Sequence, residues 1–99
     1  MSRAKTAEEV RAEFIAILKT YAAYWASLPD KSPYERCDGM AFSMLALLDG
    51  SAMGFPAVDI SLSPHPDDKA YCQTNGKNWH EHGMVINDCQ LHELFYEKK

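Results

Sequence analysis

The residue types that bind metal ions or activate water are concentrated in one polar stretch, residues 63–83. This stretch opens with SPHPDDKAYC and later carries WHEHG. A catalytic zinc site needs about three histidine, cysteine or carboxylate ligands and one open position. Its His/Asp-rich part, residues 65–82, is therefore a candidate metal site of a metal-binding protein or metal-dependent hydrolase. The candidate metal ligands are His65, Asp68, His80 and His82, with Asp67 and Cys72 of the stretch and Cys89 beyond it as further donors.

The same stretch also fits a polar loop without a cofactor, which is the interpretation we favour. His80 and His82 share one face only if the chain is extended there, and H-x-H spacing alone is a weak signal. A helical turn is expected near Asp67–Gln73, where carboxylates are favourable in a first turn. The sequence thus predicts no catalytic residue, with zinc or another divalent metal as the alternative cofactor.

The segment PHPDDK within this stretch resembles the zinc motif PHPDDE of de-N-acetylases that act on N-acetylglucosamine derivatives. The resemblance implies zinc ligands at His65 and Asp68 and a base at Asp67. The family's glutamate is replaced by Lys69, and the 31 residues after Asp68 are too few for the rest of such a domain. We therefore interpret the resemblance as coincidental.

The three cysteines, Cys37, Cys72 and Cys89, are an odd number without a C-x-x-C pair. This usage favours reduced thiols in a cytoplasmic protein. Cys37 falls on an apolar helical segment and is expected to be protected, whereas Cys72 is expected to be accessible on the loop. No nucleophile elbow, phosphate-binding glycine loop or dinucleotide fingerprint is present in the sequence.

Two amphipathic helices are predicted before this stretch, over residues 6–28 and 32–49. Each begins with a capping box, Thr6 with Glu9 and Ser32 with Glu35. The first helix has an apolar stripe at spacings of three and four. The second is apolar on nearly all sides from Met40 to Leu48, so we expect it to lie between the first helix and another layer.

That other layer is predicted to be a small, mainly antiparallel sheet formed by strands 57–62, 84–87 and 89–96. AVDISL alternates apolar and polar residues with the period of a half-buried strand. Residues 89–96 also fit a helix, because Leu91, Leu94 and Phe95 have helical spacing. The predicted fold is α+β in a single domain, residues 1–99, with disorder at residues 1–5 and at the last two lysines. Phe14, Leu45 and Ile60 are expected to share its core.

The composition limits the classes of partner. The formal net charge is −4, and no basic stripe is present, so nucleic acid is not expected to bind. The N-terminus lacks the apolar region of a signal peptide, and the longest apolar run is too short to cross a bilayer, so no membrane association is expected.

Pattern and composition together favour an interaction protein. The pattern YERCDGMAFSMLALLDG, FPAVDISLSPHPDDKAYC and LHELFYE resembles a small bacterial domain family without an assigned activity. This resemblance implies a small cytoplasmic bacterial protein. We expect a non-catalytic interaction module that binds a second copy of itself or another protein.

Overall fold

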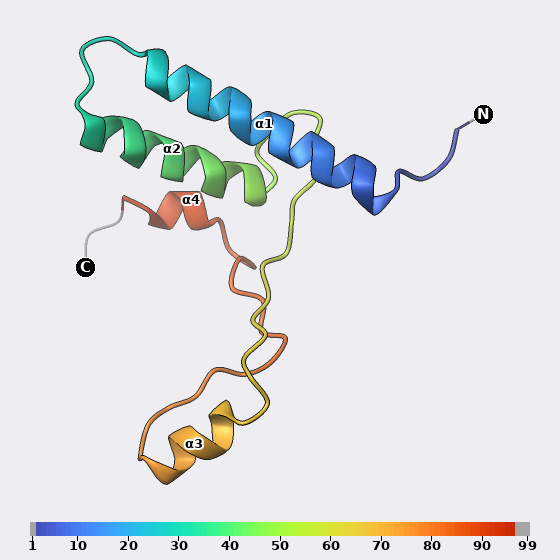
Figure 1. The fold of residues 1–99 in the computed structure, drawn as a ribbon, viewed down its shortest axis with the longest axis vertical. Coiled ribbons are helices and arrows are strands. Elements are labelled where there is room, and N and C mark those ends of the chain that lie inside the picture. Colours follow the sequence, from blue (N-terminus) through green and yellow to red (C-terminus); the bar gives the residue numbers. More distant parts are fainter. Residues whose placement is uncertain (1, 97–99) are drawn as a thin grey trace.

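The computed structural model describes residues 2–96 and places four helices among them. The helices are α1 (Ala7–Ser27), α2 (Pro33–Leu48), α3 (Asp68–Thr74) and α4 (Leu91–Leu94). α1 and α2 form a hairpin, and the chain then runs outward to α3 and returns to place α4 beside α2 (Figure 1). The radius of gyration is 17.6 Å, whereas a compact domain of this length has about 13 Å. The molecule therefore consists of a helical body and a projecting arm, residues 63–82.

Both long helices begin at the predicted capping boxes. Glu9 donates its backbone N–H to Thr6 Oγ1 at 3.1 Å, and Thr6 N–H donates to Glu9 Oε1 at 2.8 Å. Ser32 and Glu35 repeat this arrangement at 3.1 and 2.8 Å. These contacts satisfy N–H groups that the first turn leaves unpaired. The observed helices agree with the predicted ranges to within one residue at each end.

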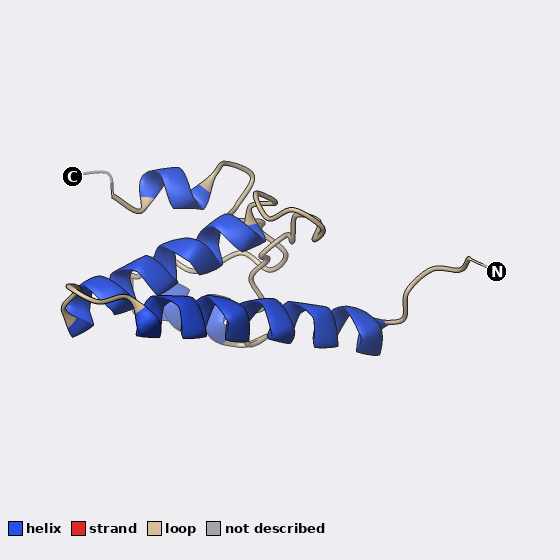
Figure 2. Cartoon of the chain, turned by 90° about the horizontal axis from the view of Figure 1, so that it is seen from above, coloured by secondary structure: helices blue, strands red, loops and turns tan. Residues whose placement is uncertain are grey.

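α2 lies between α1 and α4, which places it in the middle of the helical body (Figure 2). Gly39 of α2 is buried against the indole of Trp25, and a Cβ at this position would overlap the ring. Trp25 Nε1 also donates a hydrogen bond to Ser43 Oγ at 2.9 Å. The absence of a side chain at Gly39 therefore allows the two helices to approach closely.

The predicted sheet is wrong, and with it the α+β assignment, because the described residues contain no β-strand. Segments 57–62 and 84–87 do run side by side, but they form one isolated antiparallel bridge, between Ser61 and Val85. Leu62 N–H donates to Met84 O at 3.0 Å, and Asn87 Oδ1 accepts from Ile60 N–H at 2.8 Å. Two extended segments without a third strand or a covering helix are marginal on their own. An alternating pattern is therefore not sufficient for a sheet here.

The predicted strand 89–96 contains the short helix α4 instead. Its aromatic residues pack on Phe42 of α2, with ring centroids 6.3 Å apart for Phe95 and 5.3 Å for Tyr96. The helical spacing of this segment therefore prevails over the strand pattern and brings Phe95 onto α2, whereas Leu94 remains exposed. α2 has the central position that the sequence predicts, but helix α4 occupies the place expected for the sheet.

The expected core of Phe14, Leu45 and Ile60 is also incorrect, because all three are only half-buried. The buried large hydrophobic residues of the described part are Leu47 and Phe55, and Phe14 packs on Phe55 at 5.8 Å between ring centroids. The predicted disorder at residues 1–5 and at Lys98 and Lys99 stays a prediction. Met1 and residues 97–99 lie outside the described residues.

Candidate functional site

The candidate metal ligands all lie in the arm, but the structure does not bring them together as one site. Asp68 and His80 line a shallow pocket of about 270 Å³ with Leu62, Ser63 and Pro64. His65 and His82 are not among the residues that line this pocket. Among residues 2–96, no three His, Cys, Asp or Glu side chains are placed to hold one metal ion. The arm therefore offers a pair of ligands, Asp68 and His80, where a zinc site needs three or four.

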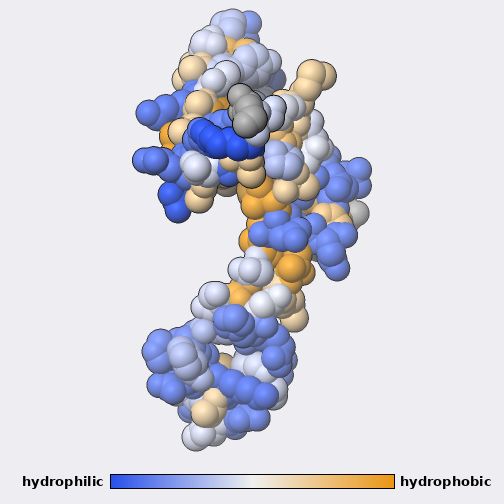
Figure 3. Space-filling view, turned by 90° about the vertical axis from the view of Figure 1, so that its right-hand side faces the viewer, coloured by the Kyte–Doolittle hydropathy of each residue, from blue (hydrophilic) through white to orange (hydrophobic). Residues whose placement is uncertain are grey.

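The polar residues of the arm instead make short-range contacts with their neighbours. Asp67 donates its backbone N–H to His65 Nδ1 at 3.1 Å, just before α3 begins at Asp68. Lys69 lies 5.1 Å from the centre of the Trp79 ring, a cation–π contact across the arm. In Figure 3 the outer part of the arm is mainly hydrophilic, and hydrophobic residues gather where the arm meets the body. This region has the properties of a solvated polar loop.

The cysteine environments are the reverse of those expected. Cys37 is exposed on α2, whereas Cys72 in α3 is half-buried. The expectation assumed that every face of the apolar helix would be covered. One face of α2 remains open, and Cys37 lies on it.

This open face forms an apolar groove, which we call the α1/α2 groove. It has a volume of about 580 Å³ and is shallow and open to solvent. Small residues and one aromatic ring of α1 form one wall, and a longer stripe of α2 forms the other. The lining residues are Ala22, Trp25 and Ala26 of α1 and Pro33, Arg36, Cys37, Met40, Ala41 and Met44 of α2.

The groove exists because α2 carries apolar residues on three sides. Successive residues of an α-helix advance about 100° around its axis. Gly39 and Ser43 therefore face α1, and Phe42 faces α4. Cys37, Met40 and Met44 lie on the third side, which neither helix covers. The apolar character of residues 40–48 was visible in the sequence, but the sequence did not show which side would stay open.

Arg36 contributes the single charge to the groove lining, and this charge has a structural partner. Its Nη2 donates to the carbonyl oxygen of Leu28 at 2.8 Å, beyond the last turn of α1. A cation at a helix C-terminus interacts favourably with the carbonyl groups left unpaired there. Arg36 thus fixes the turn between the two helices, and the remaining lining is apolar.

On the opposite side of α2, a buried carboxylate holds α4. The Asp49 side chain is 0% exposed, and its Oδ2 accepts from the backbone N–H of His92 at 2.8 Å. His92 Nδ1 lies 2.8 Å from the same oxygen, so the ring and the backbone of His92 both contact this carboxylate. The His92 ring also packs edge-on against Phe42 at 5.6 Å between centroids. Asp49 and His92 therefore form a structural latch between α2 and α4.

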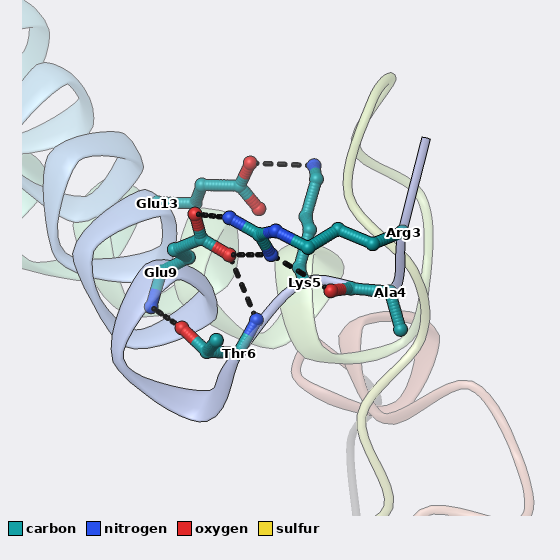
Figure 4. Close-up of polar contacts among 6 residues, drawn as sticks. All are labelled: Arg3, Ala4, Lys5, Thr6, Glu9 and Glu13. Atoms are coloured by element: carbon teal, nitrogen blue, oxygen red, sulfur yellow. Dashed lines mark hydrogen bonds and ion pairs between the residues drawn. The ribbon is translucent and has the colours of Figure 1, made fainter. Parts of the chain in front are cut away.

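Charged residues outside the groove support the start of α1 (Figure 4). Arg3 binds Glu9 through two hydrogen bonds of 2.9 and 2.8 Å, and Lys5 pairs with Glu13 at 2.6 Å. The Arg3 guanidinium, followed by the backbone N–H of Thr6, lowers the pKa of Glu9 to about 2. The pKa of Glu35 is also lowered, mainly by the backbone N–H of Ser32, without an arginine among the causes. These residues stabilise the starts of the two long helices.

Comparisons with protein-family models, with curated proteins and with solved structures found no match to this chain. The resemblance to a small bacterial domain family therefore stays a prediction. Within residues 2–96, no helix has both the length and the apolar composition needed to cross a bilayer. The α1/α2 groove combines an apolar lining with two helices that pack closely on each other.

Proposed function

We propose that this chain is a non-catalytic, cytoplasmic protein-interaction module that binds its partner through the α1/α2 groove. The observation that carries the proposal is the apolar lining of the groove, in which Arg36 is the single charged residue. Contiguous apolar surface on a folded protein commonly marks an interaction site. Methionine residues such as Met40 and Met44 are common at such surfaces because their side chains adapt to a partner.

The open shape of the groove, rather than its volume, supports a protein partner over a small molecule. A small-molecule site encloses most of its ligand in a concave pocket and fixes it with a few polar groups. The groove is shallow, and its charged group, Arg36, is already bound to Leu28 O. A helix or another apolar surface would match this lining better, as in the helix-in-groove mode of recognition.

The alternative function, metal binding or metal-dependent hydrolysis, has weaker support. It depends on Asp68 and His80, which share a pocket without a third ligand among the described residues. The interaction module is therefore the function that we propose, and the metal content of the Asp68→Asn variant tests the alternative.

Site-specific photo-crosslinking in the producing cell tests the proposal. A photoreactive phenylalanine analogue replaces Met44 in the groove or, as the matched control, Met53, which is fully exposed on a loop outside it. We expect a discrete protein adduct from position 44 and none from position 53. Equal labelling from both positions, or no adduct from position 44, would contradict the proposed function.

A further inference from the structure

We infer that the partner in the α1/α2 groove is a second copy of this chain, so that two helical hairpins form a four-helix bundle. This inference rests on the proposed interaction function and names its partner. It follows from the exposed area of the chain, from the spacing of the groove residues and from their charge.

The exposed area of the isolated chain is larger than a monomer of this mass requires. The solvent-accessible surface is 7819 Å². A compact monomer with the same mass of 11.2 kDa would expose about 5,700 Å², so the excess is about 2,100 Å². A standard stable interface buries about 800 Å² on each partner. The extended arm contributes to this excess, and so does the open side of α2, where Cys37 and Met44 are exposed.

The open side of α2 has the residue spacing of a helix–helix seam. Pro33, Cys37, Met40 and Met44 follow one another at intervals of four, three and four residues. This is the spacing that brings apolar residues to the contact line of two packed helices. The opposite wall of the groove presents the small residues Ala22 and Ala26, which leave room for a helix to approach. A helix therefore fits the groove along its length.

The charge distribution favours a second copy over an unlike partner. A two-fold dimer places the same surface of both chains in contact, so this surface must match itself. Repulsion between two chains of net charge −4 would oppose association if the acidic residues lay on the contact face. The groove contains no acidic residue, and its one cation, Arg36, lies beside the turn between α1 and α2, where its Nη2 donates to Leu28 O while its Nε has no hydrogen-bond partner among the described residues. An apolar face of this kind is compatible with itself, whereas a strongly basic partner would find no acidic group on it.

Sedimentation equilibrium of the full chain and two methionine variants tests the inference. Met44→Glu places a charge in the groove, and Met53→Glu places the same charge on the loop outside it. Glutamate is a good helix former, so Met44→Glu should retain the helical circular dichroism of the wild type. We expect a wild-type dimer, an at least tenfold weaker association of Met44→Glu, and a wild-type association of Met53→Glu. If Met44→Glu loses helicity, Ala22→Lys replaces it, with the same expected loss of association.

A wild-type monomer at all concentrations would overturn the inference. So would a dimer that both methionine variants leave unchanged, because the contact would then lie elsewhere. Neither result contradicts the proposed function, which the photo-crosslinking tests separately. That function is contradicted if position 44 gives no specific adduct in cells.

Discussion

The α1/α2 hairpin and the arm differ in what holds them in place. Capping boxes, a close approach at Gly39 and the hydrogen bond between Trp25 and Ser43 stabilise the hairpin. α3 in the arm has no side-chain cap and makes no contact with another helix of the described residues. Contacts between α1 and α2 therefore hold the hairpin together. The arm depends on contacts within itself, such as the cation–π contact of Lys69 with Trp79.

This difference indicates which region can hold a binding site in a defined shape. A rigid pair of helices can present a surface of constant shape, and sites on such elements are more accurately positioned than sites on loops. The histidines and aspartates of the arm are the more chemically suggestive residues, but they lack a packed framework. The apolar residues of the hairpin lie on two packed helices, so we propose that they form the binding site.

Truncating one large apolar side chain in each region would show the difference in stability most strongly. Leu47→Ala should lower the free energy of unfolding by about 2–5 kcal/mol, because Leu47 is 0% exposed. Tyr71→Ala in the arm should change it by less than about 0.5 kcal/mol, because Tyr71 is 61% exposed. Urea unfolding followed by circular dichroism measures both values. Equal losses would show that the arm is as tightly packed as the body.

The latch on α4 is the next largest contribution to the body. Asp49→Ala should cost about 1–3 kcal/mol, because it removes a buried acceptor and leaves the His92 N–H without its partner. Asp88→Ala, which changes an exposed acid in the preceding connection, is the matched control and should have little effect. Chemical denaturation and the amide NMR signals of α4 report the change. An α4 that stays docked in Asp49→Ala would show that aromatic packing on Phe42 alone holds it.

Acid should weaken the start of α1 through Glu9. The folded pKa of Glu9 is about 2, below its ordinary value of 4.5, so its contribution is complete above pH 4.5 and is lost as the pH falls toward 2. Arg3→Ala should raise the pKa of Glu9, because Arg3 is the largest cause of the shift. Carboxyl NMR titration measures this, with Glu35 as the internal control. A Glu9 pKa that Arg3→Ala leaves unchanged would contradict the ion pair.

The smallest effect is expected for Asp68→Asn in the arm. It should change the free energy of unfolding by less than about 0.5 kcal/mol, because Asp68 is exposed at the start of a short helix. It should also leave the metal content, measured by elemental analysis of identically prepared proteins, unchanged. A fall from one bound ion per wild-type chain to none in the variant would support the metal alternative and contradict our interpretation of the arm.

Much of the helical body was predictable from sequence because its signals are local. Thr6 with Glu9 and Ser32 with Glu35 mark the helix starts through contacts between residues three positions apart. The structures of residues 57–62 and 89–96 could not be predicted from local signals, because they depend on whether a third strand or α2 covers these segments. The open side of α2 was hidden for the same reason, since an apolar residue such as Met44 does not reveal which neighbour will cover it.

The alkylation rate of Cys37 at increasing protein concentration tests most directly whether a second chain covers the groove. Cys37 lies in the groove, and Cys89, which is also exposed in one chain but lies outside the groove, is an internal control in the same molecule. We predict that Cys37 reacts rapidly in dilute protein and at least tenfold more slowly in concentrated protein, while the rate at Cys89 stays constant. Rapid reaction of Cys37 at every concentration would contradict the account.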